Sequence, residues 1–256
     1  MSSSRSSRLL LVLLVALVCS VGIAAGVSVS DESTPTGAQV GANVEGSYTL
    51  TELYQDPSYE EWTLRTSTEL TNVTWTFRLV DQAGNVIETN SDDGQNASQS
   101  ISIDEDVSQV EVQVVGDAPP VENFSYEPAP EFLVAELRHT REGGTSSTIE
   151  TYEARHYTEE SQEAREAIES AQSAIDDAGG NAEAEESLQS AIAAYEGENF
   201  GNAVDLAERA EREAGQAQAT QQRNQLILYG AIALVVIAVV LGVVYWFLNR
   251  DTGSRL

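Results

Sequence analysis

The sequence contains no lysine and a single cysteine, and each shortage excludes a class of function. Its 13 basic residues are all arginine, against 41 acidic residues, and the formal net charge is −28. Nucleic-acid binding needs a basic surface that neutralises phosphates, so this chain is not expected to bind nucleic acid. The lone Cys19 excludes an intrachain disulfide. Nucleophile elbows, phosphate-binding loops and dinucleotide fingerprints are also missing, so we expect no enzyme activity, no catalytic residue and no cofactor.

The acidic residues are spread along the whole chain rather than gathered in one tail. At molar salt the Debye length falls to about 3 Å, and the self-repulsion of such a surface is screened. A surface of short carboxylates without lysine is similar to the proteins of halophilic archaea. The chain resembles membrane-anchored cell-surface proteins of that group, which implies a high-salt envelope as its surroundings.

The N-terminus has the layout of a secretory signal peptide over residues 1–26. Arg5 and Arg8 precede an apolar run from Leu9 to Cys19, and the small residues Ala24 to Gly26 offer a cleavage site. An uncleaved signal anchor is the alternative, because the apolar stretch is almost long enough to span a bilayer. Residues 27–39 would then be a linker.

The other end carries an uncharged run of 23 residues, Leu226 to Leu248. As a helix it would extend about 34 Å, enough to cross the hydrocarbon core of a bilayer. Tyr229 at one end and Tyr245 and Trp246 at the other suit an aromatic belt. The arginine distribution predicts a single-pass cell-membrane protein, with its N-terminal ectodomain outside and residues 249–256 as a cytoplasmic tail.

Residues 40–157 alternate between apolar and polar, with turn residues about every ten positions. The stretch NVTWTFRLV, 72–80, places Val73, Trp75, Phe77 and Leu79 on one face of a strand. Seven or eight such strands predict an antiparallel β-sandwich of immunoglobulin-like or fibronectin-like architecture. No pair of cysteines flanks a tryptophan, so this resemblance is one of architecture only.

Three sequons, at Asn72, Asn96 and Asn123, make these asparagines candidates for glycosylation. His139 and His156 are expected on the strand surface, too far apart to share a metal. The acidic clusters at 92–93 and 104–106 could hold calcium, but neither has the spacing of a calcium loop, and we assign no metal site.

From Thr158 to Gln225 the period becomes helical. Thr158, Asn181 and Asn199 are suited to cap three helices, which Gly179-Gly180 and Gly197 would separate. The run GENFGNAVDLAERA, 197–210, is similar to the second helix of a tetratricopeptide repeat over about 20 residues, without the first-helix signature, the closing proline or further copies. We therefore predict a small Ala-rich bundle of coiled-coil-like helices, acting as a stalk first and as a binding element second.

The predicted fold is thus a β-sandwich, a three-helix bundle and one C-terminal transmembrane helix. The favoured function is a non-enzymatic cell-surface protein that displays a binding module on a stalk and contacts the lipid bilayer. Its partner would be another envelope protein or a polysaccharide. The alternatives are an accessory or sensory subunit docking through its membrane helix, and an exported hydrolase using dispersed carboxylates.

Overall fold

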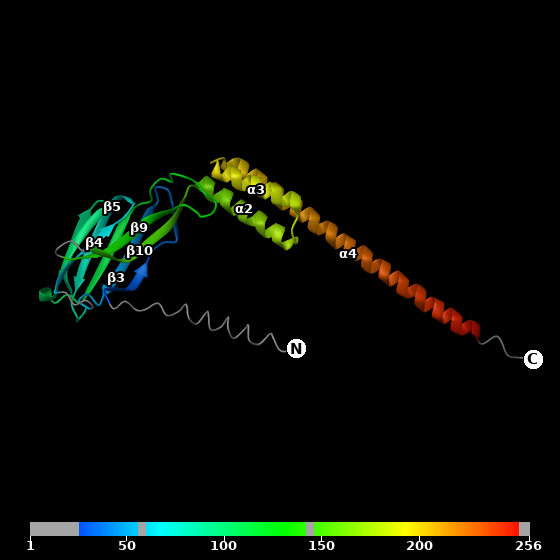
Figure 1. Ribbon diagram of the computed structural model, residues 1–256, viewed down its shortest axis with the longest axis horizontal. Helices are drawn as coiled ribbons and strands as arrows, with labels where there is room; N and C mark the ends of the chain where they lie inside the picture. The colour runs from blue at the N-terminus through cyan, green and yellow to red at the C-terminus, as the bar shows by residue number, and fades with distance from the viewer. Residues whose placement is uncertain (1–25, 56–59, 142–145, 251–256) are drawn as a thin grey trace, which may run out of the picture. The chain divides into compact units, whose positions relative to one another are not determined.

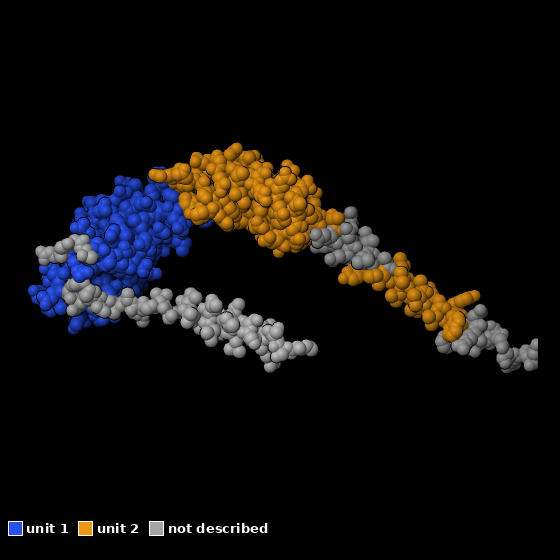
Figure 2. Space-filling model, viewed as in Figure 1, with its two compact units in different colours: residues 1–120, 131–156 blue, residues 121–130, 157–256 orange. Residues whose placement is uncertain are grey.

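The computed structural model describes residues 26–55, 60–141 and 146–250, without the side chains of 221–228, 230–231 and 247–250. The predicted signal peptide, with Cys19, and residues 251–256 of the predicted tail lie outside the described residues. The chain divides into two compact units, which Figure 2 colours separately. Residues up to Pro120 and Glu131–His156 form a β unit, while Val121–Pro130 and the chain from Tyr157 onward form a helical unit.

The β unit consists of two five-stranded sheets (Figure 1). One sheet has the order β1-β3-β8-β5-β6 and the other the order β2-β10-β9-β4-β7. The strands are β1 (Ser28–Ser33), β2 (Gly37–Gln39), β3 (Asn43–Thr51), β4 (Glu61–Ser67), β5 (Thr71–Val80), β6 (Val86–Asp93), β7 (Asn96–Ser102), β8 (Gln109–Asp117), β9 (Glu131–Thr140) and β10 (Ser146–Tyr157). β1 and β2 occupy the segment 27–39, which the sequence analysis had assigned to a linker.

The core of the β unit comes from alternate residues of its strands. In β5 the predicted face of Val73, Trp75, Phe77 and Leu79 is buried, and this strand prediction is confirmed. Successive side chains of a strand point to opposite faces, so one apolar set meets the core while threonines and an arginine face solvent. Trp62 of β4 and Phe132 of β9 extend the same cluster.

The helices of the helical unit are α2 (Glu159–Asp177), α3 (Ala182–Glu196) and α4 (Phe200–Arg250). Thr158 and Ser161 form a capping box at the start of α2, and the Asn181 side chain accepts hydrogen bonds from two backbone N–H groups of α3. These are the caps expected from the sequence. Buried alanines of α4, from Ala203 to Ala214, let the helices approach closely, with Ile168 and Tyr195 among the larger residues between them.

The segment between β8 and β9, Val121–Pro130, packs within the helical unit. Phe124 lies edge-on to Phe200, with ring centroids 4.8 Å apart, and Tyr126 lies edge-on to Tyr195 at 6.0 Å. We call this segment, Val121–Pro130, the strap, and Arg165 of α2 binds it. Its Nη2 donates to the carbonyl oxygens of Ser125, at 3.3 Å, and Tyr126, at 2.6 Å. The same guanidinium lies 4.6 Å from the centroid of the Tyr126 ring.

The predicted C-terminal transmembrane helix is wrong. In the part of the chain that the structure describes, no helix has an apolar stretch long enough to cross a membrane. The apolar run is not a separate element but the continuation of α4. The predicted single-pass membrane location, which rested on this span, is corrected with it.

Candidate functional site

The three sequon asparagines lie at separate exposed places and form no common site. Asn72, near the start of β5, has a positive φ of 52° and donates to Asp117 Oδ2 at 2.8 Å. Asn96 is the first residue of β7, and Asn123 belongs to the strap. All three side chains are open to solvent, as a glycan would require.

The prediction that both histidines lie on the surface is wrong, because His139 and His156 are both buried. His139 packs against Trp62, with ring centroids 4.7 Å apart, and His156 against Phe132 at 5.4 Å. Burial lowers the pKa of each imidazole from its ordinary value of 6.5, so both are neutral at pH 7. The described residues include no group of three His, Cys, Asp or Glu side chains placed to hold a metal ion, at either acidic cluster or elsewhere.

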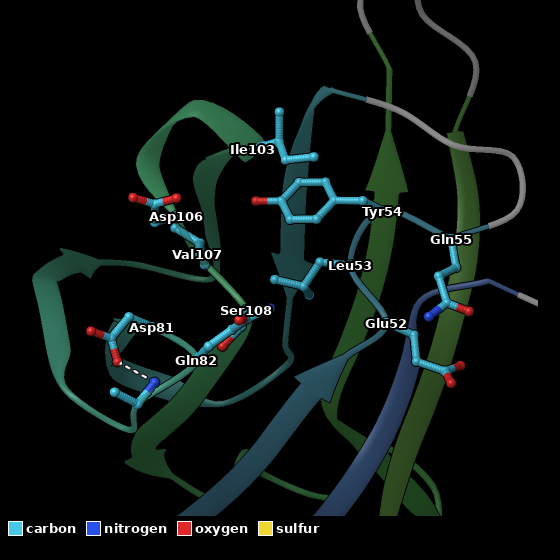
Figure 3. A pocket seen from close by; sticks show the side chains of 11 residues that line it. Glu52, Leu53, Tyr54, Gln55, Asp81, Gln82, Ile103, Asp106, Val107 and Ser108 are labelled. Carbon is cyan, nitrogen blue, oxygen red and sulfur yellow. Dashed lines mark hydrogen bonds between the residues drawn. The ribbon is translucent and has the colours of Figure 1, made fainter.

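A depression of the β unit lies at one end of its sheets, where three connections meet (Figure 3). Its volume is about 680 Å³. The connections are β3–β4, β5–β6 and β7–β8, and the last includes the short 3-10 helix η1 (Ile103–Glu105). The lining residues are Glu52, Leu53, Tyr54, Gln55, Asp81, Gln82, Ala83, Ile103, Asp106, Val107 and Ser108. Loops held by a rigid scaffold are a common place for binding residues.

Tyr54 is the polar group at the centre of this depression. In Figure 3 its ring reaches across toward the connection that carries Asp106 and Val107. Its hydroxyl oxygen is buried and has no hydrogen-bond partner among the described residues. Burial, with a smaller contribution from the charge of Glu105, raises the pKa of Tyr54 to about 12. The phenol therefore keeps its proton at neutral pH.

The three carboxylates of the depression have different roles. Asp81 is occupied by its own turn: Oδ1 accepts from the backbone N–H groups of Ala83 and Asn85, each at 2.8 Å. A hydrogen bond from the Asn85 side chain, together with these backbone hydrogen bonds, lowers the pKa of Asp81 and holds the β5–β6 connection in shape. Asp81 is therefore a structural residue of the rim.

Glu52 and Asp106 remain available for a ligand. Both have left-handed backbone, with φ of 58° and 56°, a conformation that costs an L residue about 1–2 kcal/mol. Glu52 accepts only a long hydrogen bond, 3.5 Å, from Ser28, and the carboxylate of Asp106 has no hydrogen-bond partner among the described residues. Figure 3 shows the two at opposite margins of the depression. Strained residues often persist where function needs them.

Apolar groups complete the surface between these polar margins. Leu53 and Val107 are buried beneath it, whereas Ile103 is 46 % exposed. An exposed isoleucine beside a tyrosine ring offers an apolar contact, and the carboxylates and amides around it offer hydrogen bonds. This site could not be predicted from the sequence because its residues come from three connections about 20 to 50 positions apart. The only local signal was Leu53-Tyr54, an apolar pair within the alternating segment 40–157.

No family model matches the sequence, and no curated protein matches it either. Among solved structures, a DUF4466 family protein from Parabacteroides merdae is similar over 50% of this chain and 44% of its own, with 10% identity and a TM-score of 0.29. A glycosyl hydrolase family 2 member from Bacteroides cellulosilyticus is similar over 50% of this chain and 14% of its own, with 14% identity and a TM-score of 0.24.

The SrpA adhesin of Streptococcus sanguinis, as its R347E mutant, is similar over 53% of this chain and 61% of its own, with 16% identity and a TM-score of 0.21. At such TM-scores the three similarities carry no argument about function. All three proteins come from bacteria, and at these TM-scores they do not bear on the archaeal resemblance.

Proposed function

We propose that the protein is a non-enzymatic binding module that holds a neutral polyhydroxylated ligand, such as a segment of a polysaccharide, in the depression of Figure 3. The observation that carries this proposal is the pair of carboxylates, Glu52 and Asp106, held in left-handed backbone at its margins. An ionised carboxylate only accepts hydrogen bonds, so its ligand must supply donors. Hydroxyl groups of a sugar supply them, and the carbon face of the sugar ring suits Ile103 and Tyr54.

The Tyr54 phenol has a pKa of about 12, so at neutral pH it stays uncharged beside a neutral ligand. The helical unit, with its own core of alanines around Tyr195, would act as a spacer in this proposal.

The test is retention of the full chain on immobilised neutral polysaccharides (amylose, mannan and xylan) in multimolar salt. The test variant combines Glu52→Gln and Asp106→Asn, which keep side-chain size and, at position 106, tolerance of left-handed backbone. Glu88→Gln is the matched control, since Glu88 is an exposed carboxylate of β6 away from the depression. A hydrogen bond to a charged group contributes about 1.5–3 kcal/mol, so losing one should weaken binding roughly 10- to 150-fold.

Retention of wild type and Glu88→Gln on one of these polymers, with loss in the double variant, supports the proposal. Failure of wild type to bind any of the three contradicts it, and so does equal binding by the double variant. Circular dichroism of each variant, unchanged from wild type, confirms that the comparison concerns binding and not folding.

A further inference from the structure

We propose a second binding site in the β unit, on the outer face of the β2-β10-β9-β4-β7 sheet, for a ligand that carries an oxyanion, a carboxylate or a sulfate, on a saccharide-like framework. Its centre is the pair Arg65 of β4 and Arg138 of β9, which are direct partners across the antiparallel ladder. Both line a depression of about 470 Å³. This site does not depend on the loop-end depression.

Two arginines facing each other are unexpected in this chain. Only 13 arginines stand against 41 acidic residues, and like charges directly opposite on neighbouring strands destabilise a sheet. The outer face of the other sheet shows the ordinary arrangement. There Arg78 of β5 lies opposite Glu111 of β8, with Nη1 and Oε2 2.9 Å apart. An anion bound between Arg65 and Arg138 would supply the charge that Glu111 supplies to Arg78.

Charge compensation within the protein is incomplete at this pair. The nearest carboxylate, Glu136, lies 3.9 Å from Arg138 Nη1 and also accepts hydrogen bonds from Ser67 and Thr148, each at 3.2 Å. Arg65 is exposed and has no ion-pair or hydrogen-bond partner among the described residues. The guanidinium of Arg138 is thus weakly paired, and that of Arg65 has no partner among the described residues. A guanidinium group binds a planar oxyanion through two parallel hydrogen bonds.

Hydroxyl groups surround the pair on one side, whereas the row on the other side consists of Asn96, Ser67 and Glu136. Across the four strands, the row through the arginines is Ser98, Arg65, Arg138 and Thr148. The neighbouring row on one side is Ser100, Thr63, Thr140 and Ser146, which contains no charge. Hydroxyl groups both donate and accept, as the hydroxyls of a sugar do. This combination selects an oxyanion attached to a polyol over a bare ion.

Asn96 also borders this depression, through its pairing with Ser67. A glycan attached at this sequon would stand at the rim of the proposed site and compete with a soluble ligand. The unglycosylated chain is therefore the form in which to measure binding.

The experiment compares dextran sulfate with dextran, and polygalacturonate with its methyl ester, as ligands of the full chain at the lowest salt at which it stays folded. We expect at least one charged polymer to bind tenfold or more tightly than its uncharged counterpart. That difference should vanish in Arg65→Gln/Arg138→Gln. It should persist in Arg78→Gln, the matched control on the other sheet, and in Glu52→Gln/Asp106→Asn. The pair of polymers that shows the difference tells a sulfate from a carboxylate ligand.

The inference is overturned if neither charged polymer exceeds its uncharged counterpart, or if the double arginine variant keeps the difference. It is also overturned if Arg78→Gln removes the difference equally, since binding would then follow total charge alone. Loss of binding at the loop-end depression in Glu52→Gln/Asp106→Asn leaves this measurement unaffected, so the two proposals fail separately.

Discussion

Replacing Arg165 by methionine tests how the strap is held in the helical unit. Arg165 is 7 % exposed, and its guanidinium donates to two strap carbonyls while it stacks on the rings of Tyr126 and Tyr195. Methionine keeps most of the apolar stem but removes both hydrogen bonds and the charge. A hydrogen bond to a charged group contributes about 1.5–3 kcal/mol, and water can partly replace it at the half-buried strap. We expect Arg165→Met to lower the free energy of unfolding of the helical unit by about 2–4 kcal/mol.

The assay is urea unfolding of the full chain in high salt, followed by circular dichroism at the helical wavelengths. With a slope of about 2 kcal/mol per molar urea, the midpoint should fall by roughly 1–2 M. Arg212→Ala is the matched control, because Arg212 forms an exposed ion pair with Glu208 on α4, worth at most about 0.5 kcal/mol. If the urea midpoint of Arg165→Met falls by no more than that of Arg212→Ala, the reasoning is refuted.

Three further predictions concern solvent, pH and packing. Because a net charge of −28 repels itself when it is not screened, the folded chain should lose its circular dichroism signal and melt earlier as salt falls from molar to tens of millimolar, and an unchanged melting temperature would contradict this. The pKa of the buried His156 is lowered, so the stability contributed by its neutral form is present above pH 6.5 and is lost as the pH falls below 6.5. The difference in melting temperature between wild type and His156→Gln should therefore narrow from pH 7.5 to pH 5.5. A constant difference would refute this prediction. A Cβ at Gly116 would lie 2.9 Å from the Thr71 carbonyl oxygen, so Gly116→Ala should lower the free energy of unfolding in urea by about 1–3 kcal/mol. Gly215 of α4 has open space around it, so Gly215→Ala should raise the free energy of unfolding by about 0.5–1 kcal/mol. Equal shifts in the two variants would contradict this account of the packing.

Local patterns in the sequence were sufficient to predict features that lie within a single strand or at the start of a single helix. The alternation in 72–80 predicted which side chains of β5 are buried, because a strand has a side-chain period of two. Thr158 and Asn181 predicted the starts of α2 and α3, because their side chains satisfy backbone N–H groups at the first turn. Both predictions depend on residues within a few positions of one another.

Features that join distant segments could not be predicted in the same way. The strap lies inside the segment 40–157 that the sequence assigns to the β-sandwich, and only tertiary packing shows Tyr126 against Tyr195, 69 positions later. The histidines read as surface residues of strands, but neighbouring rings cover both of them. Arg65 and Arg138 are 73 positions apart, and only the register of β4 against β9 makes them partners. The uncharged run at the C-terminus predicted a separate membrane helix, whereas it continues α4.

The most direct test of the proposed binding site is amide hydrogen exchange of the full chain with and without the neutral polysaccharide that retains it. Exchange reports protection segment by segment, so it separates the loop-end depression from the helices. The proposal predicts slower exchange in residues 52–55 and 103–108, which contribute Tyr54 and Asp106, and unchanged exchange in α2 and α3. Protection confined to α2 and α3, with none in the two loop segments, would contradict it.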